Sequence, residues 1–314
     1  MSSHSRNTVI YAQWRAAVES WSFNIGLIGP GCYADSRCNR KGTAIVSTIS
    51  EEDKVVLRRA RDTLENPGLA AKITNLIGSP LERAMKQLPN KWLGTIQRAT
   101  EKSLLTALDV ALATVDTQQQ VRKKNGVHRL IVAGTGAVGG AFGIAALPVE
   151  LPISTTVMLR SIADIARSEG ESLHSVSAKL ACVEVFALGG PSVSDDDSEV
   201  GYFAIRAALS SAVAEAARYF SIRGGAGQGA PAIARLIAQI ANRFGATVTQ
   251  KTAAQAVPLV GAAGGAAVNV LFINHFQDMA WGHFTVRRLE RKYGAEVVKR
   301  AYEDLWPRAE RLIP

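Results

Sequence analysis

The sequence has 314 residues, of which 47% are hydrophobic and 20% are charged, a composition that excludes an intrinsically disordered chain and allows a large buried core. Its formal net charge of +9 favours anionic partners. Aromatic residues make up only 6% and the basic residues are interleaved with acids, a pattern that disfavours nucleic-acid binding and favours an anionic membrane surface.

Cysteine usage and the N-terminal residues indicate the cytoplasm. Three cysteines, Cys32, Cys38 and Cys182, are too few for a disulfide framework, so reduced thiols are expected. The first residues lack the long apolar core of a secretory signal. We therefore expect a cytoplasmic protein that associates with the inner face of the cell membrane.

The composition changes near residue 50. Residues 1–50 hold two tryptophans followed by a stretch rich in Gly, Pro and Cys, and we interpret them as an N-terminal extension. The main domain, residues 51–314, is expected to begin with a helix at Glu51, because Ser50 is a good cap and acids fill the first turn. Asn66-Pro67-Gly68 should end that helix.

Helical periodicity continues along the chain. Apolar positions recur at helical spacing over residues 92–115, 154–169, 173–188 and 199–220, and a further helix is expected to begin at Pro231. No stretch shows sustained strand alternation. The sequence therefore predicts an all-α, compact multi-helix bundle that ends in basic amphipathic helices.

Two stretches, residues 130–149 and 252–277, contain no charged residue and are rich in glycine. Their glycines recur at a spacing that removes side-chain bulk from one helix face and allows a neighbouring backbone to approach closely. The glycines concerned are Gly136, Gly139, Gly140, Gly143, Gly261, Gly264 and Gly265. We expect the two stretches to pack together at the centre, broken at Pro148, Pro152 and Pro258. Burial in protein and insertion into lipid both remain open.

One glycine pattern resembles a nucleotide-binding loop. Residues 134–139 match G-x-G-x-x-G, in which glycines allow a tight turn beside a pyrophosphate. That motif also requires a second strand ending in an acid about 20 residues later, and Val157 and Met158 occupy that distance. We therefore expect no nucleotide and no other cofactor.

A polar cluster near the C-terminus is the nearest approach to a catalytic or metal site. His275 and Asp278 are three residues apart and can share a helix face, a spacing that suits metal ligation or a base with its orienting carboxylate, and His283 follows. Satisfied side chains on a polar helix edge are the plainer interpretation. Glu150, between two prolines, is interpreted as a proton-exchanging group or as a cap for the helix near Ser154. Three aspartates at 195–197 suggest a solvated loop.

Three blocks of the sequence resemble the EcsC family. They are residues 128–152, residues 184–190 (EVFALGG), and residues 256–291, which include AVPLVG and GHFTVRRLER. The resemblance runs from about residue 50 to the end, and the first 50 residues have no recognised counterpart. It implies a bacterial protein whose namesake is encoded beside the components of an ABC transporter. It supplies no catalytic residue.

The sequence therefore leaves three hypotheses for function. The first is a membrane-associated, non-enzymatic helper linked to transport or envelope function, with an anionic membrane surface or a membrane protein as partner. The second is a soluble metal-dependent hydrolase that uses His275, Asp278 and His283, with Glu150 as a further candidate. The third is an interaction scaffold that forms homo-oligomers through its glycine faces.

Overall fold

The computed structural model describes residues 49–65, 68–69, 72–73, 75, 89–114, 147–190, 201–223, 230–255 and 261–305. All of these belong to one unit of the chain, Ser47–Pro314. Some predicted features lie outside the described residues: the N-terminal extension as far as residue 48, Cys32, Cys38, the glycine pattern at 134–139, Pro258, and the aspartates at 195–197. The domain boundary near residue 50 stays a prediction.

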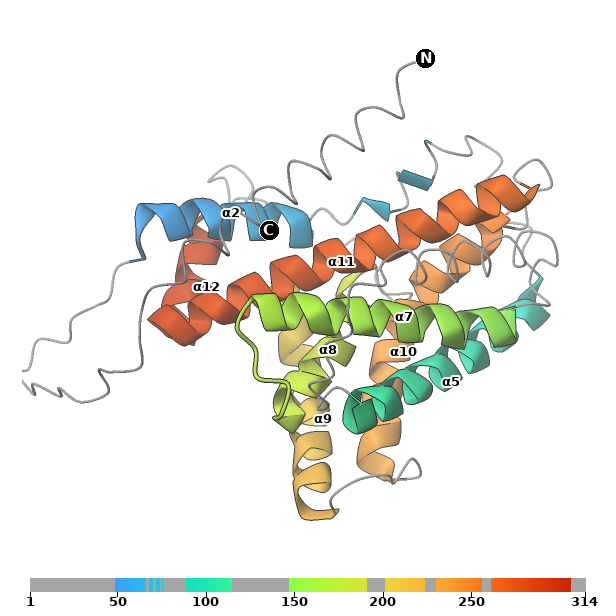
Figure 1. Ribbon diagram of the computed structural model, residues 1–314, viewed down its shortest axis with the longest axis horizontal. Helices are drawn as coiled ribbons and strands as arrows, with labels where there is room; N and C mark the ends of the chain where they lie inside the picture. The colour runs from blue at the N-terminus through green and yellow to red at the C-terminus, as the bar shows by residue number, and fades with distance from the viewer. Residues whose placement is uncertain are drawn as a thin grey trace, which may run out of the picture. The chain divides into compact units, whose positions relative to one another are not determined.

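The described part of the chain is all-α, as predicted (Figure 1). Its helices are α2 (Glu51–Glu65), α5 (Asn90–Thr114), α7 (Leu147–Ser168), α8 (Val176–Leu188), α9 (Tyr202–Arg223), α10 (Pro231–Gln255), α11 (Gly261–Tyr293) and α12 (Ala295–Asp304). No residue in the described ranges belongs to a β-strand. Helical periodicity thus identified the elements, and most of their ends differ from expectation by only a few residues.

Helix α8 lies at the centre of the described bundle. It packs against α5, α7, α9, α10 and α11, and every residue from Ala178 to Leu188 is buried. The Ser175 side chain caps the helix by accepting a hydrogen bond from the Ala178 backbone N–H. Apart from Lys179 and Glu184, the side chains from Ala178 to Leu188 are apolar on all sides of the helix. A helix of this kind has no polar face to turn to water and is therefore a core helix. Among the described helices, α8 holds this central place. The expected central packing of the two glycine-rich stretches stays a prediction, because most of the first stretch lies outside the described residues.

Helix α7 begins earlier than predicted. The sequence placed its start near Ser154, after a break at Pro148 and Pro152, but the helix begins at Leu147 and includes both prolines. A proline in the first turn of a helix costs no hydrogen bond, because the N–H groups of that turn have no partner within the helix. Pro152, one turn further on, costs the bond to the Pro148 carbonyl. The prediction of a break at Pro152 was wrong, whereas a break of the first glycine-rich stretch at Pro148 stays a prediction, because residues 130–146 lie outside the described residues.

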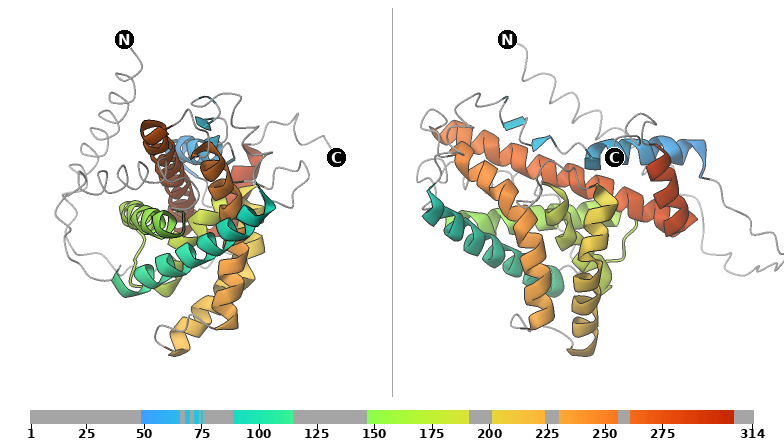
Figure 2. Two further views of the ribbon diagram at one scale, coloured as in Figure 1. Left: turned by 90° about the vertical axis from the view of Figure 1, so that its right-hand side faces the viewer. Right: turned by 180° about the vertical axis from the view of Figure 1, so that it is seen from behind.

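Helix α11 is the longest described helix, with 33 residues. It packs against α2, α7, α8, α10 and α12 (Figure 2). Its first half, residues 261–277, belongs to the second charge-free stretch, whose residues 252–255 end α10. Its second half carries the basic segment that begins at Arg287. No helix in the described ranges is both long enough and apolar enough to cross a membrane.

Candidate functional site

The structure does not gather the three residues of the predicted polar cluster into a site. His275 and His283 are both fully buried on α11, while Asp278 is exposed and pairs with Lys72 at 3.6 Å. The two histidines are eight residues apart, which is about 12 Å along a helix. Within the described ranges no group of three or more His, Cys, Asp or Glu side chains is placed to hold a metal ion.

Each histidine instead contacts the end or the side of another helix. His275 Nε2 lies 2.5 Å from the carbonyl oxygen of Gly189, directly after the end of α8. A carbonyl at a helix end has no partner within the helix, so the imidazole satisfies it. His283 Nδ1 lies 3.0 Å from the hydroxyl of Tyr202 on α9. These contacts support the plainer interpretation of polar side chains packed within the helical bundle, although His283 Nε2 is buried without a hydrogen-bond partner among the described residues.

Glu150 forms an ion pair inside the protein. It lies in the first turn of α7, and its Oε1 accepts a hydrogen bond of 2.8 Å from Lys251 Nζ in α10. Both side chains are buried, and Lys251 Nζ also lies 4.8 Å from the centre of the Phe272 ring in α11. The interpretation of Glu150 as a cap near Ser154 is wrong, because Glu150 is already inside the helix. Together with Phe272, the pair links α7, α10 and α11. Glu150 directly follows the first charge-free stretch, and Lys251 directly precedes the second.

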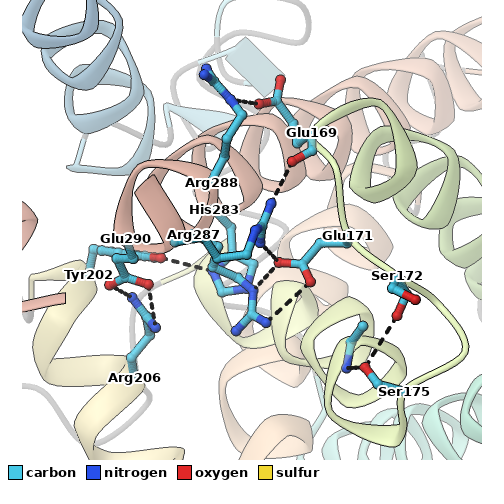
Figure 3. A network of polar contacts seen from close by, with 12 residues as sticks. Glu169, Glu171, Ser172, Ser175, Tyr202, Arg206, His283, Arg287, Arg288 and Glu290 are labelled. Carbon is cyan, nitrogen blue, oxygen red and sulfur yellow. Dashed lines mark hydrogen bonds and ion pairs between the residues drawn. The ribbon is translucent and has the colours of Figure 1, made fainter. Parts of the chain in front are cut away.

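A second polar network connects the loop after α7 with α11 (Figure 3). Glu171 binds Arg287 at 2.7 Å and also binds Arg291, while Arg288 binds Glu169 at 2.7 Å. Burial raises the pKa of Glu171, but the hydrogen bonds and charges of Arg287 and Arg291 outweigh burial and lower it. These paired charges hold the loop on the side of α11.

The network continues to α9, where Arg206 makes two hydrogen bonds to Glu290, of 2.7 and 3.2 Å. Arg206 also lies over the Tyr202 ring, 5.3 Å from its centre. Burial, followed by the positive charges of Arg206 and Arg287, holds the pKa of His283 well below its usual value. His283 is therefore a neutral imidazole in the folded protein at neutral pH.

Two buried groups of α8 lie near these charges. Burial raises the pKa of the Glu184 carboxyl, and the positive charges of Arg206 and Arg287 offset this only in part. Burial, together with the charge of Glu171, raises the pKa of the Cys182 thiol to about 12. A thiol with that pKa is protonated and unreactive, so the expectation of a reduced cysteine is confirmed at Cys182, which is free and buried.

The predicted glycine faces are described only in part. Gly136, Gly139, Gly140 and Gly143 lie outside the described residues, whereas Gly261, Gly264 and Gly265 form the start of α11. The described glycines at which an added Cβ would come closer than 3.0 Å to a neighbouring helix or side chain are Gly189, Gly190 and Gly282. An isolated glycine within a helical pattern, as at Gly282, usually has a packing reason. That signal in the sequence could have identified it.

Sequence reasoning also missed several members of these networks. Lys251 was not singled out, because nothing in its own segment indicates a partner 101 residues away. In the sequence, Tyr202 and Arg206 follow an acidic segment and look like ordinary surface positions of a helix. Only the tertiary structure brings Tyr202 next to His283 and Lys251 next to Phe272.

The chain was then compared with known proteins. No curated protein and no solved structure gives a significant match. The family model described as the EcsC protein family matches residues 54–289, from α2 to the last third of α11. This range includes the buried pair and most of the polar network. The chain therefore belongs to the EcsC protein family.

Proposed function

We propose that this EcsC-family chain is a membrane-associated, non-enzymatic helper protein for transport or envelope function, acting in the cytoplasm at the inner face of the cell membrane. One observation carries the proposal. The described parts of the two charge-free stretches, residues 147–149 and residues 252–255 and 261–277, lie at the end of the bundle where α7 and α11 begin and α10 ends (Figure 1).

The contacts around Lys251 support this arrangement. Lys251 binds Glu150, the residue directly after the first charge-free stretch. It also lies against Phe272, within the second stretch. The end of the first charge-free stretch and the second stretch therefore meet at Lys251, whereas a surface that faces only water rarely exposes a large contiguous area without charge. A membrane surface can bury an apolar region of this kind at the boundary between headgroups and acyl chains.

The charge of the chain supports an anionic partner. The formal net charge is +9, and the cytoplasmic leaflet attracts basic proteins. An anionic membrane surface or a membrane protein is the partner we propose, in keeping with the family's association with an ABC transporter. Homo-oligomer formation stays a prediction, to be checked by light scattering on the purified chain.

Cell fractionation tests the proposal. We expect the full-length protein in the membrane fraction, and its response to carbonate and high-salt washes separates integral from peripheral attachment. Release by salt indicates electrostatic attachment at the surface, because salt screens charge interactions. Recovery of the protein wholly in the soluble fraction of gently lysed cells would contradict the proposal.

A further inference from the structure

We infer that the end of the bundle formed by the N-terminal turns of α5, α7 and α11 docks on an anionic lipid bilayer. Four exposed apolar side chains define this surface, which we call the apolar end: Leu93, Val149, Ile153 and Val270. The inference deepens the proposed function and rests on it, because it names the surface and the lipid chemistry.

The exposure of these side chains is large for apolar residues. Val149 is 67% exposed and Ile153 39% exposed, and they lie one turn apart on the same side of α7. Val270 on α11 is 47% exposed and Leu93 on α5 is 45% exposed. The other large apolar side chains found exposed in the described ranges, Val55 and Ile222, lie on α2 and α9.

Helices α7 and α11 run in parallel, which brings Ile153 and Val270 to the same level. Gln277 of α11 donates a hydrogen bond of 2.7 Å to Ser161 of α7, and Arg288 binds Glu169 further along both helices. An α-helix rises about 1.5 Å per residue. Ile153 therefore lies about 12 Å before Ser161 along α7, and Val270 lies about 10.5 Å before Gln277 along α11.

Helix α5 runs the same way, which places Leu93 at this end as well. The carbonyl oxygen of Leu112, near the C-terminus of α5, accepts a hydrogen bond from Lys179 in the first turns of α8. A short loop joins α8 to the C-terminus of α7, and α5 packs along α7. The C-terminal ends of α5 and α7 therefore lie together, and so do their N-terminal turns (Figure 2).

The charges around the apolar end are those that an anionic bilayer attracts. Within residues 89–100, 147–160, 251–255 and 261–277, Glu150 is the only acidic residue, and its partner Lys251 neutralises it. Arg98 and Arg160 are exposed there. Just beyond these ranges lie Glu101 and the exposed Asp278, and Asp278 is paired with Lys72. An apolar surface bordered by an excess of positive charge fits anionic headgroups above an acyl layer. An acidic protein partner would match the arginines but would leave the apolar side chains without an acyl layer to enter.

A partly exposed tryptophan supports lipid as the partner. Trp92 precedes Leu93 at the start of α5 and is half-buried. Tryptophan is enriched where proteins meet the interface between headgroups and acyl chains, because its ring is apolar and its N–H is polar.

Vesicle co-sedimentation of the full-length protein tests the inference. The vesicles are phosphatidylcholine alone and phosphatidylcholine with a third of phosphatidylglycerol. We expect binding to the anionic vesicles, at least tenfold weaker binding to the neutral ones, and a loss of tenfold or more for the variant Val149→Ser/Ile153→Ser/Val270→Ser. Arg98→Gln and Arg160→Gln should each weaken binding to anionic vesicles about fivefold.

The chain offers a matched control. Val55 and Ile222 are 64% and 76% exposed, so Val55→Ser/Ile222→Ser removes similar apolar surface elsewhere and should leave vesicle binding unchanged. Thermal melts of all variants confirm that they are folded, and if the triple variant is not, the single variant Val149→Ser replaces it.

Three outcomes would overturn the inference. Equal losses in the triple variant and in the control, or no loss in either, would mean that the apolar end is not the contact, although membrane association would stand. Absence of wild-type binding to vesicles, with the protein still in the membrane fraction of cells, would mean that the partner is a membrane protein. The proposed function itself would be contradicted only if the wild-type protein were absent from the membrane fraction of cells.

Discussion

The environment of His283 shows how burial changes the chemistry of a residue that the sequence presents as reactive. In water a histidine titrates near neutral pH and can act as a base. Here its ring is fully buried, one nitrogen faces Tyr202, and two arginines lie close enough to oppose a positive charge. The residue therefore stays neutral and acts in packing and hydrogen bonding.

This environment predicts a pH dependence of stability. The folded-state pKa of His283 lies well below the ordinary value of 6.5. Below pH 6.5 the unfolded chain therefore binds a proton that the folded chain does not, so stability falls as the pH falls. His283 should contribute a slope of about 1.4 kcal/mol per pH unit there. Urea unfolding of wild type and His283→Gln from pH 8 to pH 5.5 measures it.

The two proteins are compared by the slope of their unfolding free energy against pH, because His283→Gln also disturbs packing and lowers stability at every pH. The wild-type protein should lose more stability than His283→Gln between pH 6.5 and pH 5.5, while the two should have parallel profiles above pH 7.5. Parallel profiles over the whole range would show that His283 takes up its proton in the folded protein.

Among the helices, close contact depends on single glycines. An added Cβ at Gly282 in α11 would lie 2.8 Å from Leu64 Cγ and 3.3 Å from the backbone oxygen of Ala60, both in α2. The glycine therefore allows α2 to lie against α11. Gly94 in α5 differs, because its nearest neighbour would be the end of the Arg98 side chain at 3.8 Å.

Substitution by alanine should change the stability of the protein in opposite directions at the two glycines. Gly282→Ala should destabilise the protein by about 1–3 kcal/mol, because the methyl group overpacks the contact with α2. Gly94→Ala should stabilise it by up to about 1 kcal/mol, because alanine is the better helix former where space is open. Chemical denaturation of both variants measures the changes. Stabilisation by Gly282→Ala would mean that α2 does not lie closely against α11.

Across the whole molecule, the buried pair of Glu150 and Lys251 connects residues that are 101 positions apart. Taking two charges out of water costs several kcal/mol for each ion, and their attraction repays this only in good geometry. Such a pair adds little net stability, but removal of one partner leaves an unpaired charge inside the protein.

Charge removal should therefore be strongly non-additive at this pair. Glu150→Met and Lys251→Met should each destabilise the protein by about 3–5 kcal/mol, and the double variant should be more stable than either single variant. The exposed pair of Asp164 and Arg167 is the matched control, and its single variants should change stability by at most about 1 kcal/mol. Additive losses at Glu150 and Lys251 would exclude a buried ion pair.

The sequence predicted the local features well. The helical periods identified α2, α5, α8, α9 and α10, and the cap at Ser50 placed the start of α2. These properties depend on neighbours within a few residues in the chain, which periodicity and capping report directly. The errors at Pro152 and at the start of α7 arose because a proline near a helix start is tolerated where one in the interior is not.

The sequence by itself determined that this is an all-α protein of the EcsC family, with two charge-free stretches and a basic net charge. Only the tertiary structure decided that α8 is the central helix, that His275 and His283 serve different helices, and that Glu150 meets Lys251. The physical reason is that the hydrophobic period of a helix tells which face is buried but not which helix covers it. Partners far apart in the chain are chosen by packing, where shape, desolvation and charge act together.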